Sequence, residues 1–414
     1  MKLKAISSSV LLALLPVSGV YAAAMDRSGQ SISAFLQPNN YFEAGISILD
    51  PTVSGSNQYG KISDMADDYY FPSAAIKLQP TKYFSWGLLY DQPFGAAATY
   101  TDGVMDGIAG PAPLGGTNVE VNSQNLTMLF GFQPNENFNI YGGGVYQEVD
   151  GNLTLSSIGY QSNFKKDSGA GWLAGLAFQI PEIALKASLT YRSEIDHELA
   201  TTERAPVIAA QIASGIATIE AIPEAFRPPA VQAQLNGLKA VNAKLGSDSK
   251  DTKITTPQSV NLEFQTGIMA NTVAFANVRW VEWGGMTIDI DKFRTITAFN
   301  GLNGGKGENI IEYDKDQWSA NVGVGRKFNE QWAGNFSVGW DSGAGNPVTA
   351  LGPTEGYWNV GLGAQFSPTP ATFIAGGVKY FWLGDADGES VGKPVGKFES
   401  NEAIAYGLKM GYRF

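Results

Sequence analysis

The chain has 414 residues and a net charge of −11; 44% of its residues are hydrophobic and 49 are glycines. Only 16% of its residues are charged, well below the roughly 25% of soluble domains. This composition does not fit an ordinary cytoplasmic enzyme. The sequence contains no cysteine and one histidine, which excludes disulfides, thiolate nucleophiles, cysteine-ligated metals and two-histidine metal sites. The acidic balance, without any Lys/Arg cluster, argues against a nucleic-acid partner.

The first 24 residues have the parts of a secretory signal peptide. A basic start with Lys2 and Lys4 precedes a short apolar core at 10–15, and small residues at 22–24 offer a cleavage site. No run of about 18 apolar residues follows, so we expect no transmembrane helix. Two classes of protein remain possible: an exported soluble protein and a membrane β-barrel.

Alternation with a period of two recurs along the rest of the chain. In segments 260–268, 358–366 and 404–414, aliphatic and aromatic side chains alternate with Gly, Asn, Ser, Gln and isolated charges. This period predicts β-strands. A second face of small polar residues suits a water-filled lumen better than bulk solvent.

Short turns and long polar segments follow one another in strict alternation. We predict six short turns, at 79–82, 133–136, 181–182, 270–271, 328–330 and 367–370. We predict seven long loops, at 51–71, 93–123, 149–169, 194–256, 284–316, 341–356 and 383–401. The expected fold is all-β, a fourteen-stranded antiparallel transmembrane β-barrel over 42–414 with both termini on the short-turn side.

The third strand contains residues that disturb pairing. Gln92, Pro93, Phe94 and Gly95 follow the strand residue Tyr90 directly. Proline donates no ladder hydrogen bond and glycine weakens a strand, so we expect a kink there that opens a gap in the wall. The alternative is that the strand ends at this point and a loop begins.

The loop at 194–256 loses the period of two and gains two helical stripes. Apolar residues recur at intervals of three and four, with prolines between the two stripes. We expect two amphipathic helices facing each other over the barrel mouth, with a capture groove formed by Ile208, Ile212, Ile216, Val231, Leu235 and Leu238. The alternative is a lid packed on itself without a binding role.

Alternation also assigns cations and phenylalanines to the lumen. The inward set is Lys186, Arg192, Phe275, Arg279, Phe373, Lys379 and Phe381. A phenylalanine beside a cation suits an amphipathic acid, and Arg279 and Lys379 are the first candidates for its carboxylate. The alternative is an ion-pair network within the lumen, for example Glu263 with Arg279.

Several segments resemble the FadL family of outer-membrane transporters for long-chain fatty acids and aromatic hydrocarbons. Strands two and three carry the resemblance in 71–77 (FPSAAIK), 84–87 (FSWG) and 91–95 (DQPFG), and later segments agree in order and spacing at 190–194, 256–259 and 398–414. The resemblance covers nearly the whole mature chain. It implies an N-terminal hatch in the lumen, an extracellular capture groove, an interior pocket and sideways release at the kinked third strand.

The hatch departs from the family pattern. Only residues 25–41 precede the first strand, a shorter hatch than is usual, and the family's Asn-Pro-Ala element is absent. The segment is polar and Ser/Gly-rich from Asp26 to Ser31, which suits a chain tucked into a wet interior. The alternative is a mobile periplasmic tail.

Enzymatic chemistry has little support. His197 is the sole candidate base, no Gly-x-Ser-x-Gly motif accompanies it, and a lone loop histidine is usually a surface residue. We therefore predict a non-enzyme without cofactor or metal, a passive outer-membrane transporter for long-chain fatty acids or related hydrophobic compounds. We expect a monomer that contacts outer-membrane lipids, lipopolysaccharide and the barrel-assembly machinery. The rival is a diffusion porin for small polar solutes.

Overall fold

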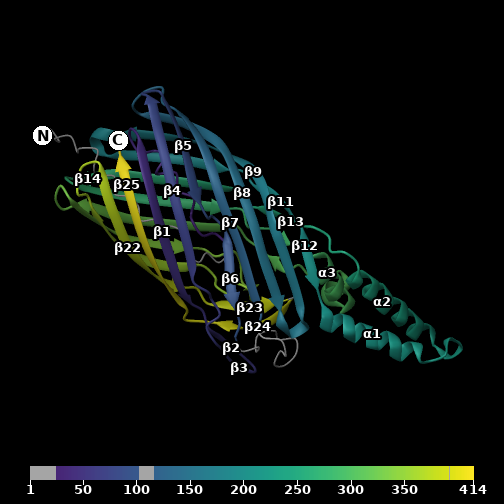
Figure 1. The fold of residues 1–414 in the computed structure, drawn as a ribbon. Coiled ribbons are helices and arrows are strands. Elements are labelled where there is room, and N and C mark those ends of the chain that lie inside the picture. Colours follow the sequence, from purple (N-terminus) through teal and green to yellow (C-terminus); the bar gives the residue numbers. More distant parts are fainter. Residues whose placement is uncertain (1–24, 102–115, 391) are drawn as a thin grey trace.

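The computed structural model describes residues 25–101, 116–390 and 392–414. The predicted signal peptide, 1–24, lies outside these residues. Within them, one antiparallel sheet closes on itself through pairing of β9 with β10, and its strands form a long barrel (Figure 1). This sheet has sixteen described strands. Because β6 (Gly95–Thr99) continues the line of β5 along β7, and β12 (Thr201–Arg204) continues the line of β10 along β9, fourteen strand positions go round the barrel.

The fourteen predicted strands are confirmed. They are β1 (Tyr41–Thr52), β4 (Tyr69–Thr81), β5 (Phe84–Asp91), β7 (Asn118–Phe132), β8 (Phe138–Leu155), β9 (Tyr160–Ile180), β10 (Leu185–Arg192), β14 (Ser259–Met269), β15 (Thr272–Val281), β18 (Gln317–Lys327), β19 (Trp332–Asp341), β21 (Tyr357–Phe366), β22 (Thr372–Leu383) and β25 (Glu402–Arg413). The six short turns fall where predicted, one of them as the 3-10 turn η3 (Pro181–Ile183). At the β14–β15 turn, Asn271 takes a positive φ of 58°, which asparagine tolerates better than most residues.

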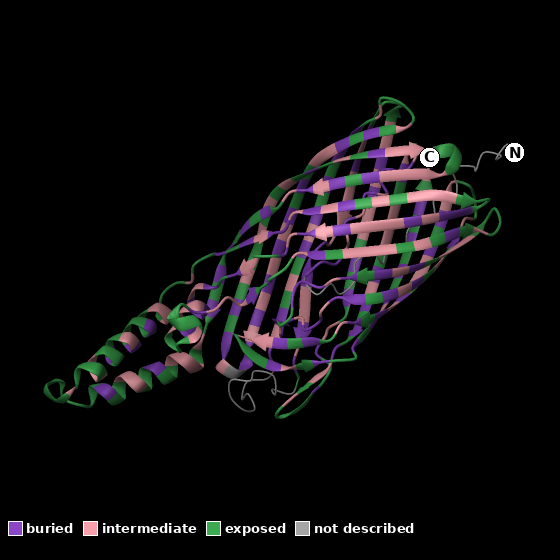
Figure 2. Cartoon of the chain, turned by 180° about the vertical axis from the view of Figure 1, so that it is seen from behind, coloured by how far each residue is buried: buried purple, intermediate pink, exposed green. Residues whose placement is uncertain are grey.

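The outer surface of the barrel is apolar and its rims are aromatic. Leu362, Leu408 and Met410 are 60%, 51% and 55% exposed, and buried and exposed residues alternate along the strands (Figure 2). Trp332 packs on Phe366 at the short-turn rim, with ring centroids 4.9 Å apart. An apolar band bounded by aromatic girdles is the surface of a barrel that spans a membrane.

The predicted loop at 149–169 is wrong. Strands β8 and β9 continue well past the rim and are joined by η2 (Ser156–Ile158), after which Gly159 turns the chain with a φ of 59°. Outside the membrane the outer face of a strand is wetted by water and carries polar side chains such as Asn152 and Lys166. The parts of β8 and β9 beyond the rim therefore have the amino-acid composition of a loop, although they form a paired β-ribbon.

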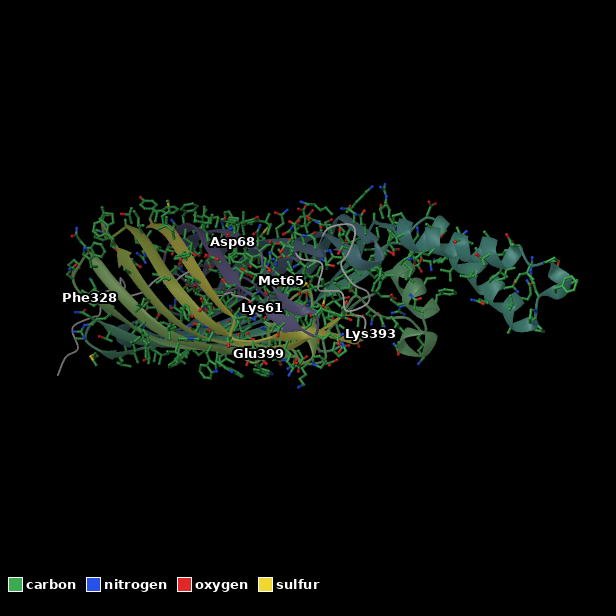
Figure 3. All side chains as sticks on the ribbon, turned by 90° about the horizontal axis from the view of Figure 1, so that it is seen from below. Lys61, Met65, Asp68, Phe328, Lys393 and Glu399 are labelled. Atoms are coloured by element: carbon green, nitrogen blue, oxygen red, sulfur yellow. The ribbon has the colours of Figure 1, made fainter. Side chains whose placement is uncertain are left out.

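Other extracellular segments form a cap over the barrel mouth. It contains β2 (Gly55–Asn57), β3 (Gly60–Ile62), β20 (Val348–Thr349), β23 (Ala386–Ser390) and β24 (Lys393–Phe398) in one sheet, the ribbon of β16 (Thr287–Ile288) and β17 (Ile311–Glu312), α3 (Asp291–Phe299) and η5 (Leu302–Gly305). In Figure 3, Phe328 marks the short-turn end, whereas Lys393 lies towards the end with the helices. Trp283, Phe293 and Phe398 are fully buried in one apolar cluster of the cap, so the mouth is covered.

The two predicted helices are confirmed, but the predicted capture groove is wrong. Helices α1 (Pro206–Glu220) and α2 (Pro229–Gly246), joined through η4 (Glu224–Phe226), project away from the barrel as a hairpin (Figure 1). Their apolar stripes pack against each other, burying or half-burying Ile208, Ile212, Ile216, Val231, Leu235 and Leu238. Because each stripe covers the other, no open groove remains between them.

Among the described helices, none combines the length and apolar character needed to cross a membrane.

Candidate functional site

Residues 25–40 lie inside the barrel as a hatch, so the alternative of a mobile tail is wrong. Phe35 is fully buried and packs edge-on against Tyr141 of β8, with ring centroids 6.0 Å apart. Its ring fits against Gly87 and Gly131, where an added Cβ would approach it to 3.0 and 3.1 Å. This apolar anchor ties the hatch to the wall formed by β5, β7 and β8.

Polar side chains of the wall fasten the hatch backbone. They donate to hatch carbonyls as follows: Lys77 to Gln37 at 2.5 Å, Lys186 to Leu36 at 3.0 Å, Arg192 to Gln30 at 2.5 Å and Asn261 to Gly29 at 2.7 Å. Lys186 and Arg192, predicted to bind ligand, therefore serve the hatch in this structure.

Arg279, the first predicted carboxylate-binding cation, is paired with the hatch. Its Nε lies 2.6 Å from Oδ2 of Asp26, with both side chains over nine-tenths buried. It also donates to Asn261 Oδ1 at 2.7 Å and Gln30 Oε1 at 3.0 Å. The alternative of an ion-pair network in the lumen therefore describes Arg279, but its partner is Asp26 and not Glu263. Glu263 accepts a hydrogen bond from Ser31 Oγ at 2.7 Å.

A cavity of about 170 Å³ lies between the hatch and the wall. Residues of β18, β19, β22 and β25 that line it are mainly polar and include Asn321, Asn335, Ser337, Asp341, Lys379 and Lys409. Lys379 is 7% exposed and lies along Gly361 beside Ser337. In the described part of the chain, no hydrogen bond or ion pair engages its ammonium group, whereas Lys409 pairs with Glu43 at 2.9 Å.

The three predicted phenylalanines lie in different places. Phe275 lines the cavity and covers Gly323, where a Cβ would approach its ring to 2.3 Å. Phe373 lies near the short-turn end, stacked on Tyr41 with ring centroids 6.4 Å apart. Phe381 packs against Tyr357 in the buried cluster near the mouth. Only Phe275 of the three shares the cavity with Lys379. Alternation fixes the face of a residue but not its height in the barrel.

The wall is interrupted at the predicted kink. Strand β4 pairs with β5 from Thr81 only as far as Ala74, which lies opposite Tyr90. Beyond that point, at 69–73, β4 has no ladder partner in the described residues except β1, while the third strand resumes as β6 along β7. Pro72 and Pro93 stand on the two sides of the interruption, and neither has an N–H to donate.

The first hatch residues lie on the inner side of this interruption. Gly95 N–H donates to the carbonyl of Met25 at 2.8 Å, and Arg27 N–H donates to that of Pro93 at 2.6 Å. The Arg27 guanidinium lies 4.0 Å from the centre of the Tyr69 ring, a cation–π contact. A Cβ at Gly95 would lie 2.2 Å from Arg27 Cζ, so a side chain there would displace the guanidinium from its present place.

The cavity reaches the interruption from inside, since Pro72 and Gln92 are among its lining residues. Pro72 is exposed and Gln92 is half-buried. The third strand breaks between Asp91 and Gly95, where the sequence predicted a kink. Arg27 and Asp91 were not predicted as functional residues, and the Asp91 carboxylate accepts a hydrogen bond from Ser28 Oγ at 2.6 Å. The polar composition of the hatch from Asp26 to Ser31 was the only sequence feature that pointed to these contacts.

His197 is buried, contrary to the predicted surface position. Strands β11 (Ile195–Leu199) and β13 (Thr252–Thr256) pair as a ribbon outside the membrane, and His197 is 3% exposed there. Its Nε2 lies 3.0 Å from Gln147 Oε1 and its Nδ1 lies 3.3 Å from Asp167 Oδ2. Gly169 leaves room for the ring, which explains how a loop histidine becomes buried.

Acidification is expected to loosen this ribbon. Burial lowers the pKa of His197 below its ordinary value of 6.5, although the Asp167 carboxylate opposes the shift. The unfolded ribbon therefore takes up protons more readily than the folded one. The contribution of neutral His197 to the stability of the ribbon is complete above about pH 6.5 and declines as the pH falls below that value. Hydrogen exchange of the β11 and β13 amides should be several-fold faster at about pH 5 than at about pH 7.5, after correction for intrinsic rates. A His197→Gln variant should lose that difference, and equal protection of the native ribbon at both pH values would contradict the assignment.

Solved structures show the same architecture. A FadL homologue from Pseudomonas aeruginosa superposes with a TM-score of 0.68 at 13% identity, covering 91% of each chain. The toluene transporter TodX from Pseudomonas putida gives 0.61 at 11% identity, covering 96% of this chain and 99% of its own. The toluene transporter TbuX from Ralstonia pickettii gives 0.54 at 11% identity, covering 97% and 100%.

The likeness lies in the fold and not in the sequence. No protein-family model matches the chain, and no curated protein matches it. The chain nevertheless has the closed fourteen-stranded fold of FadL-type channels over nearly its full described length.

Proposed function

We propose that this chain is an outer-membrane channel through which a small hydrophobic compound diffuses passively and leaves sideways into the bilayer. The observation that carries the proposal is the interruption between β4 and the third strand, which the lumen cavity reaches at Pro72 and Gln92. A compound in the cavity thus has a short route to lipid that avoids bulk water. The described function of TodX and TbuX, toluene transport on the same fold, supports this reading.

The cavity favours a compact ligand. An engineered cavity of about 150 Å³ holds one benzene molecule, and the lumen cavity here is about 170 Å³. A long acyl chain needs more room than one ring. We therefore place a single-ring or short-chain compound ahead of a long-chain fatty acid as substrate.

A diffusion porin is the second candidate, and the structure offers it little support. A porin needs a continuous aqueous lumen. Here the cap buries Trp283 and Phe293 at the mouth, and Tyr41 and Phe373 stack near the short-turn end. The polar cavity lining is what a porin shares with this barrel, but bulky aromatic side chains lie at the mouth and near the short-turn end of the lumen.

Uptake and conductance together test the proposed function. Cells expressing the protein should take up radiolabelled toluene faster than vector-only cells, and an unrelated barrel expressed to the same level should not. In planar bilayers the purified protein should show little ion conductance. Steady porin-like conductance without a gain in toluene uptake would replace the proposal with the porin.

Lys379 is expected to select for acids among compounds of this size. A charge-assisted hydrogen bond contributes about 1.5–3 kcal/mol, so Lys379→Met should weaken benzoate binding by roughly tenfold or more while toluene binding stays within about twofold. Calorimetry on the purified protein measures both. Lys61→Met, on the exposed β3, is the control and should change neither affinity. Equal weakening of both ligands by Lys379→Met would refute this role.

A further inference from the structure

We propose that residues 29–37 of the hatch stay in place during transport and that the substrate passes beside them, along the inner face of β18, β19, β21 and β22. This inference rests on the proposed function and adds the route. It also makes the glycines of that face determinants of substrate size.

The hatch is fastened on one side of the barrel. Lys77, Lys186, Arg192 and Asn261, the side chains that donate to its carbonyls, come from β4, β10 and β14, and Phe35 is anchored against β5, β7 and β8. Withdrawing residues 29–37 would leave three cations in the lumen without these acceptors and would open the pocket that Phe35 fills. Each of these losses costs free energy, so the withdrawn state is sparsely populated.

The opposite side of the barrel is kept open by glycines. Lys379 lies flat over Gly361, and Asn359 lies flat over Gly339, where an added Cβ would approach the Asn359 amide to 2.4 Å. Long side chains on this face therefore run along the wall and not across the lumen. The cavity is the space that they leave between wall and hatch.

This face also offers hydrogen-bond acceptors along the route. Gln317 Oε1 and Asn321 Oδ1, on two residues that line the cavity, are buried and have no hydrogen-bond partner within the described residues. Buried amide oxygens are normally paired, so they are positioned to accept from a hydroxyl or amine hydrogen of a passing compound. A single-ring compound with such a group, for example a phenol, fits the route better than a plain hydrocarbon.

The same cavity extends across the barrel. It reaches Asp341 and Tyr357 below the cap and Pro72 and Gln92 at the wall interruption. Both ends of the route therefore belong to one cavity, and Gly29, Gln30 and Ser31 of the hatch form part of its lining.

A reversible cross-link of the hatch tests the first half of the inference. Ser31 Oγ and Glu263 Oε1 are 2.7 Å apart, and the native chain has no cysteine. In a Ser31→Cys, Glu263→Cys variant, a short bis-methanethiosulfonate reagent should join the two thiols, with completeness checked by mass. Phenol uptake into proteoliposomes should stay within about twofold of the same protein after reduction. A tenfold loss that reductant restores would overturn the inference.

A glycine substitution tests the second half independently. A Cβ at Gly361 would lie 2.8 Å from Ser337 Oγ and 2.9 Å from Lys379 Cγ, so Gly361→Leu should push Lys379 into the cavity and slow uptake about tenfold. Gly376→Leu is the matched control on β22, because its nearest neighbours are 3.5 and 3.8 Å away and it faces outward. Heat-dependent gel mobility shows that both variants are folded barrels. Unchanged uptake by Gly361→Leu would overturn the route.

The two proposals fail in different ways. If the wild-type protein carries no phenol or toluene, the proposed function falls. If the wild type is active and the cross-linked hatch is not, only the route falls.

Discussion

Joining residues 72 and 92 across the wall interruption should reduce uptake at least tenfold. Pro72 and Gln92 line the cavity where β4 and the third strand are not paired. A Pro72→Cys, Gln92→Cys variant treated with a short reversible thiol cross-linker closes this opening, while the lumen and its binding residues stay unchanged. Toluene uptake by proteoliposomes, before and after reduction, measures the effect.

A cross-link in an intact part of the wall is the matched control. Leu362 and Val378 are paired neighbours on β21 and β22 and both face outward. A Leu362→Cys, Val378→Cys variant should transport equally well with and without the cross-link. Equal uptake by the variant at 72 and 92 before and after reduction would show that the substrate does not leave at the interruption.

Breaking the Asp26–Arg279 pair should release the first hatch residues. Removing one partner of a buried ion pair typically costs about 3–5 kcal/mol, because the other charge is left uncompensated. In an Asp26→Ala variant the hydrogen bonds from Gly95 to Met25 and from Arg27 to Pro93 should open far more often. Hydrogen exchange of the Arg27 and Gly95 amides should accelerate by roughly a hundredfold or more.

Replacing both Asp26 and Arg279 distinguishes the effect of an unpaired buried charge from the effect of losing the side chains. An Asp26→Leu, Arg279→Met double variant leaves no unpaired charge, so the protection of these two amides should return to within about tenfold of wild type. Unchanged exchange in Asp26→Ala would mean that the pair does not hold the hatch in the wall interruption.

The barrel itself could be predicted because its determinants are local. Outward-facing residues such as Leu408 and Met410 must meet lipid, so the period of two persists along each strand and the short turns mark the strand ends. The extensions of β8 and β9 beyond the membrane escaped prediction, because no lipid constrains their outer residues. The helical hairpin was predicted by its stripes, but its direction depends on packing that no local pattern records.

The lumen was predictable residue by residue but not pair by pair. Alternation placed Arg279 and Lys379 inside correctly, yet they have opposite surroundings: Arg279 meets Asp26, which is 253 positions away in the chain, and Lys379 meets the cavity. Partner choice in a barrel depends on the stagger between strands and on where the hatch lies. Neither follows from a single sequence.

The most direct test of the account is to locate a bound substrate analogue in the barrel. Crystals soaked with bromotoluene would reveal the bromine by its anomalous scattering. The account predicts bromine peaks in the lumen cavity near Lys379 and in the wall interruption between Pro72 and Gln92. Bromine confined to the helical hairpin, or placed on a path past Tyr41 and Phe373 at the short-turn end, would contradict it.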